Sequence, residues 1–324
     1  MATGGRVLLL TDEAMAGHRP PAHPERPERL SAAASGVADG AASAGASLGR
    51  PAVEPAEAAD LERVHPAPFL ALLDEVAREG GGWIDPDTFI GPDSMVAARL
   101  AAGVTIQAAR AAAAGDVDVA FAAVRPPGHH ARRNRAAGFC LLNNVSVAAL
   151  ALRASGLAQR IAILDWDVHH GDGTQSIFDG DPDLCYASTH QMPLYPGSGE
   201  AAERGTGPGL GSKHNVPLAP GSGDDAFTEA WLTRLLPAVE AFAPAAILVS
   251  AGYDAHRLDP LAQLEVTAAG YRSVAEAVGR MARAGGVGGI ALTLEGGYDL
   301  DALHDSAAAT VAGLLAGLSG LEAG

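Results

Sequence analysis

The sequence predicts an α/β fold in which a parallel β-sheet carries helices on both faces. Short runs rich in Leu, Ile and Val alternate with longer Ala-rich stretches of helical character along the 324 residues. Strands that alternate with helices form βαβ units, and such units build parallel sheets. No repeat, low-complexity linker or change in composition divides the chain, so residues 1–324 are predicted to form one domain.

The expected strands are short apolar runs, β-branched or rich in Leu. They are Arg6–Leu10, Val117–Val124, Arg160–Leu164, Leu184–Ser188, Ala245–Ser250 and Gly289–Leu294. The Gly- and Pro-rich stretch Tyr195–Gly223 is predicted to be a long, ordered loop close to the functional site.

The expected helices are longer, and several have recognisable ends. Asp93 or Pro92 begins one helix and Gly115 ends it, while Asp224 is expected to cap another. The predicted helices are Pro27–Asp39, Pro68–Glu79, Pro92–Ala114, Asn144–Ser155, Asp224–Phe242, Thr267–Ala284 and Leu300–Leu318.

Composition argues against several classes of protein. A hydrophobic content of 48% suits a large core, yet no apolar run approaches the ~20 residues of a membrane span. The first 16 residues lack the apolar core of a signal peptide, and two cysteines (Cys140 and Cys185) are too few for a disulfide framework, so we expect a cytoplasmic protein. A formal net charge of −16 argues against binding to nucleic acid.

The segment 161–173 contains the densest group of metal-binding side chains. Asp165, Asp167 and His169 alternate after an apolar run, so a strand would place them on one face, spaced about 6–7 Å apart. Carboxylate oxygens and imidazole nitrogens together favour a divalent metal. The alternative is a polar strand-to-helix turn in which Asp172 caps the helix and the histidines face solvent.

Other predicted strands also end in reactive side chains, and ligands of open α/β sheets bind beyond the carboxyl ends of the strands. The segments that follow these strands are Arg125–His130, Thr189–His190, Ala251–Asp254 and Glu295–Tyr298.

These strand ends supply the parts of a hydrolytic metal site. A catalytic zinc takes three protein ligands, and Asp254 is the best candidate to complete the set begun by Asp167 and His169. The adjacent His129 and His130 suit proton transfer, with Asp165 and Asp172 as their carboxylate partners. Tyr298 could donate to a developing oxyanion. Taken alone, each of these residues could be a helix cap, a loop histidine or a packed aromatic. Because several strand ends carry such residues, we favour the interpretation that they form one metal site.

Six motifs together resemble the zinc-dependent histone deacetylase superfamily. In chain order they span about residues 18 to 300. Their residue patterns are most similar to those of the class II branch and its bacterial amidohydrolase relatives. The motifs are His23–Arg29, Arg125–Ala131, Gly138–Asn143, Asp165–Gly173, Ser250–His256 and Leu294–Tyr298.

The resemblance implies a three-layer α/β/α fold with a central parallel sheet of about eight strands. It also implies one zinc ion held by Asp167, His169 and Asp254. His130 would be the general base and later the general acid, with Asp172 behind it. His129 would be its electrostatic partner, hydrogen-bonded to Asp165, and Tyr298 would stabilise the oxyanion.

The resemblance further implies one or two potassium ions and a tunnel for the acylated side chain. The inner potassium would contact Asp165, Asp167, His169, Ser188 and Thr189, and the outer one Phe178, Asp181 and Leu184. The tunnel would be formed by Gly138 and Phe139 on one side, with Leu194 and Tyr195 at the position of the second wall, and Arg29 would line an acetate-release channel.

The substrate implied is an acetylated, or otherwise acylated, lysine of a protein or peptide. The alternative is an acetylpolyamine or another small amide. Leu261 matches the position of the polyamine branch's acidic gatekeeper, and its apolar side chain favours acyl-lysine, while Asp87 is placed to bind the substrate backbone at the rim. Less favoured readings are an arginase-like manganese hydrolase and a non-catalytic zinc protein that binds acyl groups. The oligomeric state, including a homo-oligomer, stays open, as do the roles of His18, His23, His170 and His256.

Overall fold

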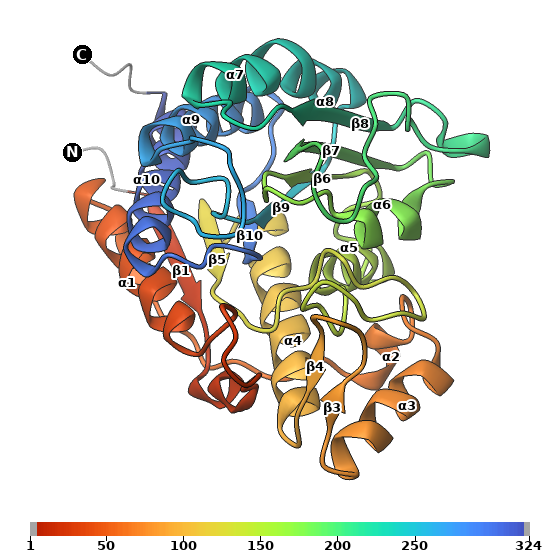
Figure 1. The fold of residues 1–324 in the computed structure, drawn as a ribbon. Helices are drawn as coiled ribbons and strands as arrows, with labels where there is room; N and C mark the ends of the chain where they lie inside the picture. The colour runs from red at the N-terminus through yellow and green to blue at the C-terminus, as the bar shows by residue number, and fades with distance from the viewer. Residues whose placement is uncertain (1–4, 321–324) are drawn as a thin grey trace.

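The computed structural model describes residues 5–320 and contains one eight-stranded, all-parallel sheet (Figure 1). The predicted fold class is therefore confirmed. The strand order is β2-β1-β5-β10-β9-β6-β7-β8. The strands are β1 (Arg6–Leu10), β2 (Ser47–Gly49), β5 (Val119–Ala122), β6 (Ile161–Asp165), β7 (Leu184–Gln191), β8 (Lys213–Leu218), β9 (Ala246–Ala251) and β10 (Ile290–Leu294). A separate antiparallel hairpin pairs β3 (Gly82–Trp83) with β4 (Phe89–Ile90).

Helices cover both faces of the sheet (Figure 1). On one face α4 packs against β5, β9 and β10 and beside α5, and on the other α10 packs beside α1 and α9. Within residues 5–320 no helix is both long and apolar enough to cross a membrane. The helices are α1 (Glu28–Ser43), α2 (Ala58–Leu61), α3 (Ala67–Arg78), α4 (Ser94–Ala113), α5 (Asn144–Ala154), α6 (Asp172–Phe178), α7 (Asp224–Glu229), α8 (Leu236–Phe242), α9 (Ala268–Ala284) and α10 (Leu300–Ser319).

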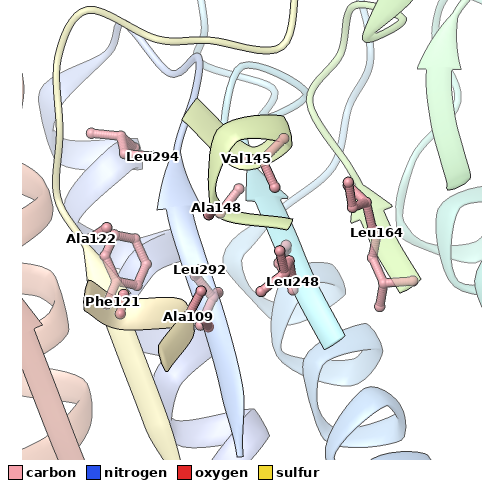
Figure 2. Packing of buried hydrophobic residues seen from close by; sticks show 14 of the residues in the cluster. Ala109, Phe121, Ala122, Val145, Ala148, Leu164, Leu248, Leu292 and Leu294 are labelled. Atoms are coloured by element: carbon pink, nitrogen blue, oxygen red, sulfur yellow. The ribbon is translucent and has the colours of Figure 1, made fainter. Parts of the chain in front are cut away.

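The core lies between the sheet and these helices. Figure 2 shows Ala109 of α4 and Val145 of α5 beside the strands that carry Ala122 of β5 and Leu248 of β9. All four side chains are at most 2% exposed. Burying a side chain the size of Phe or Leu contributes roughly 1.5–3 kcal/mol, and small residues on α4 allow that helix to approach the strands closely. Packing of the helices on the sheet therefore fixes the position in space at which each strand ends.

The predicted loop over Tyr195–Gly223 is wrong in part, because Lys213–Leu218 forms the edge strand β8. An edge strand has one neighbour only, so it needs no continuous apolar run, and proline is tolerated there. Pro217 and three polar residues hid the strand pattern.

The predicted helix Asp224–Phe242 is present, but its middle turn, Ala230–Leu235, is π-helical. Pro237 lacks an N–H, and its ring displaces the carbonyl four residues earlier, which accounts for the wider turn. Asp224 does not cap this helix, contrary to prediction. Its carboxylate instead accepts hydrogen bonds from the backbone N–H and the hydroxyl of Thr267, both at 2.7 Å, and so ties α7 to the start of α9.

Candidate active site

Five neighbouring strands end at one edge of the sheet and place the candidate residues there. In the spatial order β5, β10, β9, β6 and β7 these strands are followed by, or carry, the His129–His130 pair, Tyr298, Asp254, the Asp167–His169 pair and Ser188. Residues as far apart in sequence as 129 and 298 therefore meet because their strands are close neighbours. This is the strand-end rule on which the sequence prediction relied.

Asp167, His169 and Asp254 form a compact group. One ligand atom from each lies within 4.8 Å of the others. His169 Nδ1 is 3.1 Å from Asp167 Oδ1 and 3.1 Å from Asp254 Oδ2, and both aspartates are 1% exposed. Two carboxylates and one imidazole nitrogen are a donor set that zinc accepts. The three residues could therefore hold a divalent metal.

Glycines and backbone donors bring the two carboxylates together. A Cβ at Gly252 would collide with the Asp167 carboxylate, and one at Gly296 would collide with that of Asp254. The N–H of Gly296 donates to Asp167 Oδ2 at 2.8 Å, and the N–H of Val168 donates to Asp254 Oδ1 at 2.9 Å. Each carboxylate is thus oriented by the backbone, with its other oxygen facing His169.

The group is strongly electronegative. Burial and the neighbouring Asp167 raise the pKa of Asp254. Burial lowers the pKa of His169, but Asp167 and Asp254 outweigh that effect and raise it to about 10. Buried carboxylates at this density require a positive counter-charge, which a divalent cation would supply.

The two adjacent histidines each contact a different carboxylate. His129 Nδ1 lies 3.1 Å from Asp165 Oδ2, and His130 Nδ1 lies 2.8 Å from Asp172 Oδ1. Because an ionised carboxylate can only accept, each Nδ1 carries the proton and each neutral ring would present a free Nε2 as a base. These are the pairs that the resemblance implied.

The two histidines differ in charge. Burial lowers the pKa of His130, and the positive charge of His129 lowers it further, to about 3. Burial also lowers the pKa of His129, but Asp167 and Asp165 outweigh it and raise this pKa well above its usual value. His130 is therefore neutral near pH 7 and able to accept a proton, whereas His129 is cationic.

Sequence reasoning missed Arg132, which lies behind Asp172. Its Nε and Nη2 donate to Asp172 Oδ2 at 3.0 and 2.8 Å, opposite the oxygen that contacts His130. Burial raises the pKa of Asp172, but His130 and Arg132 together lower it to about 2. Arg132 keeps Asp172 ionised, and its position two residues after the histidine pair was the only signal in the sequence.

Tyr186 and Glu295 were also missed as supports of the histidine pair. The hydroxyl of Tyr186 donates to Asp165 Oδ2 at 2.9 Å. The buried carboxylate of Glu295 accepts from the backbone N–H groups of Gly128 and His129 at 2.6 and 3.1 Å, and so holds the turn before His130. Tyr186 lies on β7 and Glu295 directly after β10, both far in sequence from the histidine pair, so no local pattern reveals them.

Tyr298 lies at the base of the candidate pocket. Its ring is 7% exposed, and the Arg29 guanidinium lies 4.8 Å from the ring centroid. Its backbone N–H donates at 2.6 Å to Asp259, a buried carboxylate that sequence reasoning did not single out. Burial raises the pKa of Tyr298 well above its usual value, so the hydroxyl keeps its proton and can donate.

A pocket of about 80 Å³ reaches His169, one of the three possible metal ligands. Leu194 packs on the core, so Tyr195 supplies the wall opposite Phe139. The Tyr195 ring lies 5.0 Å from that of His130, and Phe139 has a left-handed backbone (φ +69°), a conformation that few non-glycine residues adopt. The lining residues are Asp87, Pro127, His129, His130, Gly138, Phe139, His169, Tyr195, Gly296 and Tyr298.

Leu261, predicted to contact substrate, and Arg29, predicted to line an acetate channel, lie outside this lining. Leu261 follows the Asp259 turn, where its N–H donates to Asp259 Oδ1 at 3.0 Å. Arg29 lies beneath Tyr298, where it pairs with Glu25 at 3.1 Å and donates to the backbone oxygens of Glu295 and Gly297.

The four histidines whose roles stayed open contact other side chains or the backbone. His18 contacts the Ser94 hydroxyl at 2.7 Å, and His256 Nδ1 accepts from the N–H of Leu258 at 3.2 Å. His170 lies between Ser198 and Gln175. The His23 ring stacks edge-on to Phe139, with the centroids 4.3 Å apart.

The two residue sets predicted to hold potassium differ in their surroundings. Asp165 pairs in register with Ser188, so the inner set is brought together where β6 and β7 meet. The outer set lies in the turn between α6 and β7, but there the carbonyl oxygens of Asp181 and Leu184 accept from the ammonium of Lys213 at 3.2 and 2.8 Å. These two oxygens of the outer set are therefore already engaged by a cationic side chain.

Comparisons with known proteins agree with this geometry. Residues 23–314 match the histone deacetylase domain. A probable deacetylase of Archaeoglobus fulgidus is 39% identical over 324 residues, which cover 99% of this chain and 88% of the relative. The solved HDA15 HD domain is 37% identical with a TM-score of 0.89, covering 98% and 92% of the two chains. An acetylpolyamine aminohydrolase from Burkholderia pseudomallei is 30% identical with a TM-score of 0.83, covering 95% and 98%.

Proposed function

Because this chain belongs to the histone deacetylase family of deacetylases and amidohydrolases, we propose that it is a zinc-dependent enzyme that removes acetyl or other short acyl groups from acyl-lysine in peptides or proteins. One observation carries the proposal. The possible metal ligand His169, the neutral His130 and the Tyr298 hydroxyl all line a single pocket. An amide entering it would meet a Lewis acid, a base and an oxyanion donor together.

Each residue then has a chemical task. Bound zinc would polarise the amide carbonyl and lower the pKa of a water molecule at the site. His130 Nε2 would take a proton from the attacking water, with Asp172 fixing the ring, and would later return that proton to the leaving amine. The Tyr298 hydroxyl would donate to the carbonyl oxygen as its negative charge develops.

Tyr298→Phe is expected to lower kcat by roughly a hundredfold, because it removes one donor to the oxyanion and leaves the ring in place. Kinetics on an acetyl-lysine peptide would measure this. Tyr271→Phe in α9 is the matched control, since its hydroxyl is buried without a hydrogen-bond partner and does not line the pocket. We expect that control to retain wild-type kcat, and unchanged activity in Tyr298→Phe would contradict the assigned role.

The pocket lining favours acyl-lysine over acetylpolyamine. Phe139 and Tyr195 form apolar walls that suit a methylene chain, and Asp87 is the only carboxylate in the lining. A polyamine brings a further cation, and leaving that cation unpaired in a desolvated site is costly. Leu261 does not line the pocket, so the apolar walls carry this choice.

The substrate class can be read from kcat/KM for an acetyl-lysine peptide and for N-acetylputrescine. We expect the peptide value to be at least about tenfold higher, equivalent to ~1.4 kcal/mol of transition-state discrimination. A higher value for N-acetylputrescine would move the chain to the polyamine branch, which the Burkholderia pseudomallei structure represents.

The arginase-like alternative needs a second group of metal ligands. Within residues 5–320 the potential metal ligands form one such group, Asp167, His169 and Asp254. Finding two Mn²⁺ ions per chain by metal analysis would nevertheless support the arginase-like alternative. The non-catalytic alternative would be supported if the zinc-loaded protein cleaved no acetylated amine.

A further inference from the structure

Lys213 is the single lysine among the 22 lysines and arginines of the chain, and it is completely buried. Lysine is among the residues least often buried, because its ammonium loses hydration inside a protein. Every other basic position is an arginine, so a lysine at this one buried position needs a local explanation.

The ammonium of Lys213 is surrounded by neutral oxygens. Nζ donates to the Ser212 hydroxyl at 2.7 Å and to the carbonyl oxygens of Leu184 and Asp181 at 2.8 and 3.2 Å. A lysine has three N–H donors, and all three are used here. The carboxylate of Asp181 pairs with Arg153. The ammonium is therefore coordinated much as a monovalent metal ion would be.

The amine is charged at neutral pH. Burial lowers the pKa of Lys213 to about 8, while the carboxylates of Asp181 and Asp179 oppose the shift. A compact ammonium matches three oxygens that converge on one point, whereas a planar guanidinium spreads its donors over a wider fork. This explains why arginine, used everywhere else, is absent here.

We infer that the Lys213 ammonium is the resident cation of the turn between α6 and β7 and takes the place of the outer potassium ion there. A second cation at the same carbonyl oxygens would be repelled at contact distance in a buried site. Within residues 5–320 no lysine or arginine side chain donates to the backbone oxygens of the inner set (Asp165, Asp167, His169, Ser188 and Thr189). The chain therefore binds at most one potassium ion.

The turn matters because it connects two supports of the histidine pair. α6 begins at Asp172, the partner of His130, and β7 carries Tyr186, the partner of Asp165. An internal cation holds this connection whatever the potassium concentration. The inference does not depend on the proposed function, because folding and ion binding test it.

The principal test compares thermal unfolding of the wild type, Lys213→Ala and Lys213→Met at constant ionic strength in choline, potassium and ammonium chloride. In choline chloride we expect Lys213→Ala to unfold roughly 5 °C or more below the wild type, because buried carbonyl oxygens lose their donors. Potassium or ammonium should restore part of that loss saturably. Lys213→Met should respond no more than the wild type does, since its side chain fills the space.

Arg272→Ala is the matched control, because it removes one positive charge from the exposed surface of α9. We expect its unfolding temperature to follow that of the wild type in all three salts. An unfolding temperature for Lys213→Ala equal to the wild-type value in choline chloride would overturn the inference.

Two measurements on the wild type keep the inference testable if the variants do not fold. Equilibrium dialysis with metal analysis should find no more than one potassium ion per chain, and two would refute the substitution. An amine-acylating reagent should label Lys213 only after unfolding in urea, and mass spectrometry reads this at a unique site. Equal labelling of folded and unfolded protein would contradict the buried, coordinated ammonium.

Discussion

Replacing His130 with alanine is expected to lower kcat by at least about a hundredfold, the usual contribution of a positioned general base. His130 lines the pocket, is neutral near pH 7 and has its ring fixed by Asp172 at 2.8 Å. Without the imidazole, we expect neither of the other two histidines of the pocket lining to take its place, because His129 is held by Asp165 and His169 is a proposed metal ligand. Steady-state kinetics of the zinc-loaded protein would show the loss in kcat more than in KM.

The matched control is His214→Ala, a histidine of β8 that does not line the pocket. We expect this variant to keep wild-type kcat. The unfolding temperature and bound metal of His130→Ala should stay close to wild type, which separates a chemical loss from a structural one. Wild-type kcat in His130→Ala would exclude His130 as the base and leave the proton transfer to another group.

Arg132→Gln separates positioning from proton transfer at the same site. Arg132 contacts Asp172 but not the pocket, so its replacement should affect kcat much less than loss of His130 does. The neutral glutamine withdraws a charge that helps keep Asp172 ionised. The effect should therefore be a partial loss, with His130 still in place.

Sequence reasoning located the site because the site follows a general rule. Asp167 and Asp254 are 87 positions apart, and they meet because β6 and β9 are neighbours whose carboxyl ends coincide. The motif residues could be recognised because each follows directly after an apolar run, and such a run indicates a strand that ends there. The same rule says nothing about strand order, which comes from packing of the helices.

The residues that were missed act through partners distant in sequence. Arg132 and Asp259 look like ordinary surface or turn residues until the fold places Asp172 beside one and the Tyr298 backbone beside the other. Lys213 was missed for a second reason. It lies in edge strand β8, whose polar residues and proline predicted a loop, so neither its burial nor its carbonyl partners could be anticipated.

Removal of metal by dialysis against a strong chelator is expected to reduce activity to below about 1% of the starting value, and Zn²⁺ to restore it. The electronegative group of Asp167, His169 and Asp254 provides three ligands, and the remaining position would serve water and substrate. Activity and metal content measured on the same samples test this. A folded apoprotein should also unfold at a lower temperature, because a ligand that binds only the native state stabilises it.

Asp254→Ala should reproduce the effect of the chelator without one, because the variant loses a ligand and leaves Asp167 and His169 to hold the ion. We expect a large fall in both bound zinc and kcat. Asp225→Ala, which removes an exposed carboxylate of α7 outside the pocket lining, is the matched control and should retain both. Full activity in a chelated sample free of metal would rule out the metal-assisted mechanism. Restoration by Mn²⁺ at two ions per chain, with none by Zn²⁺, would favour the arginase-like chemistry instead.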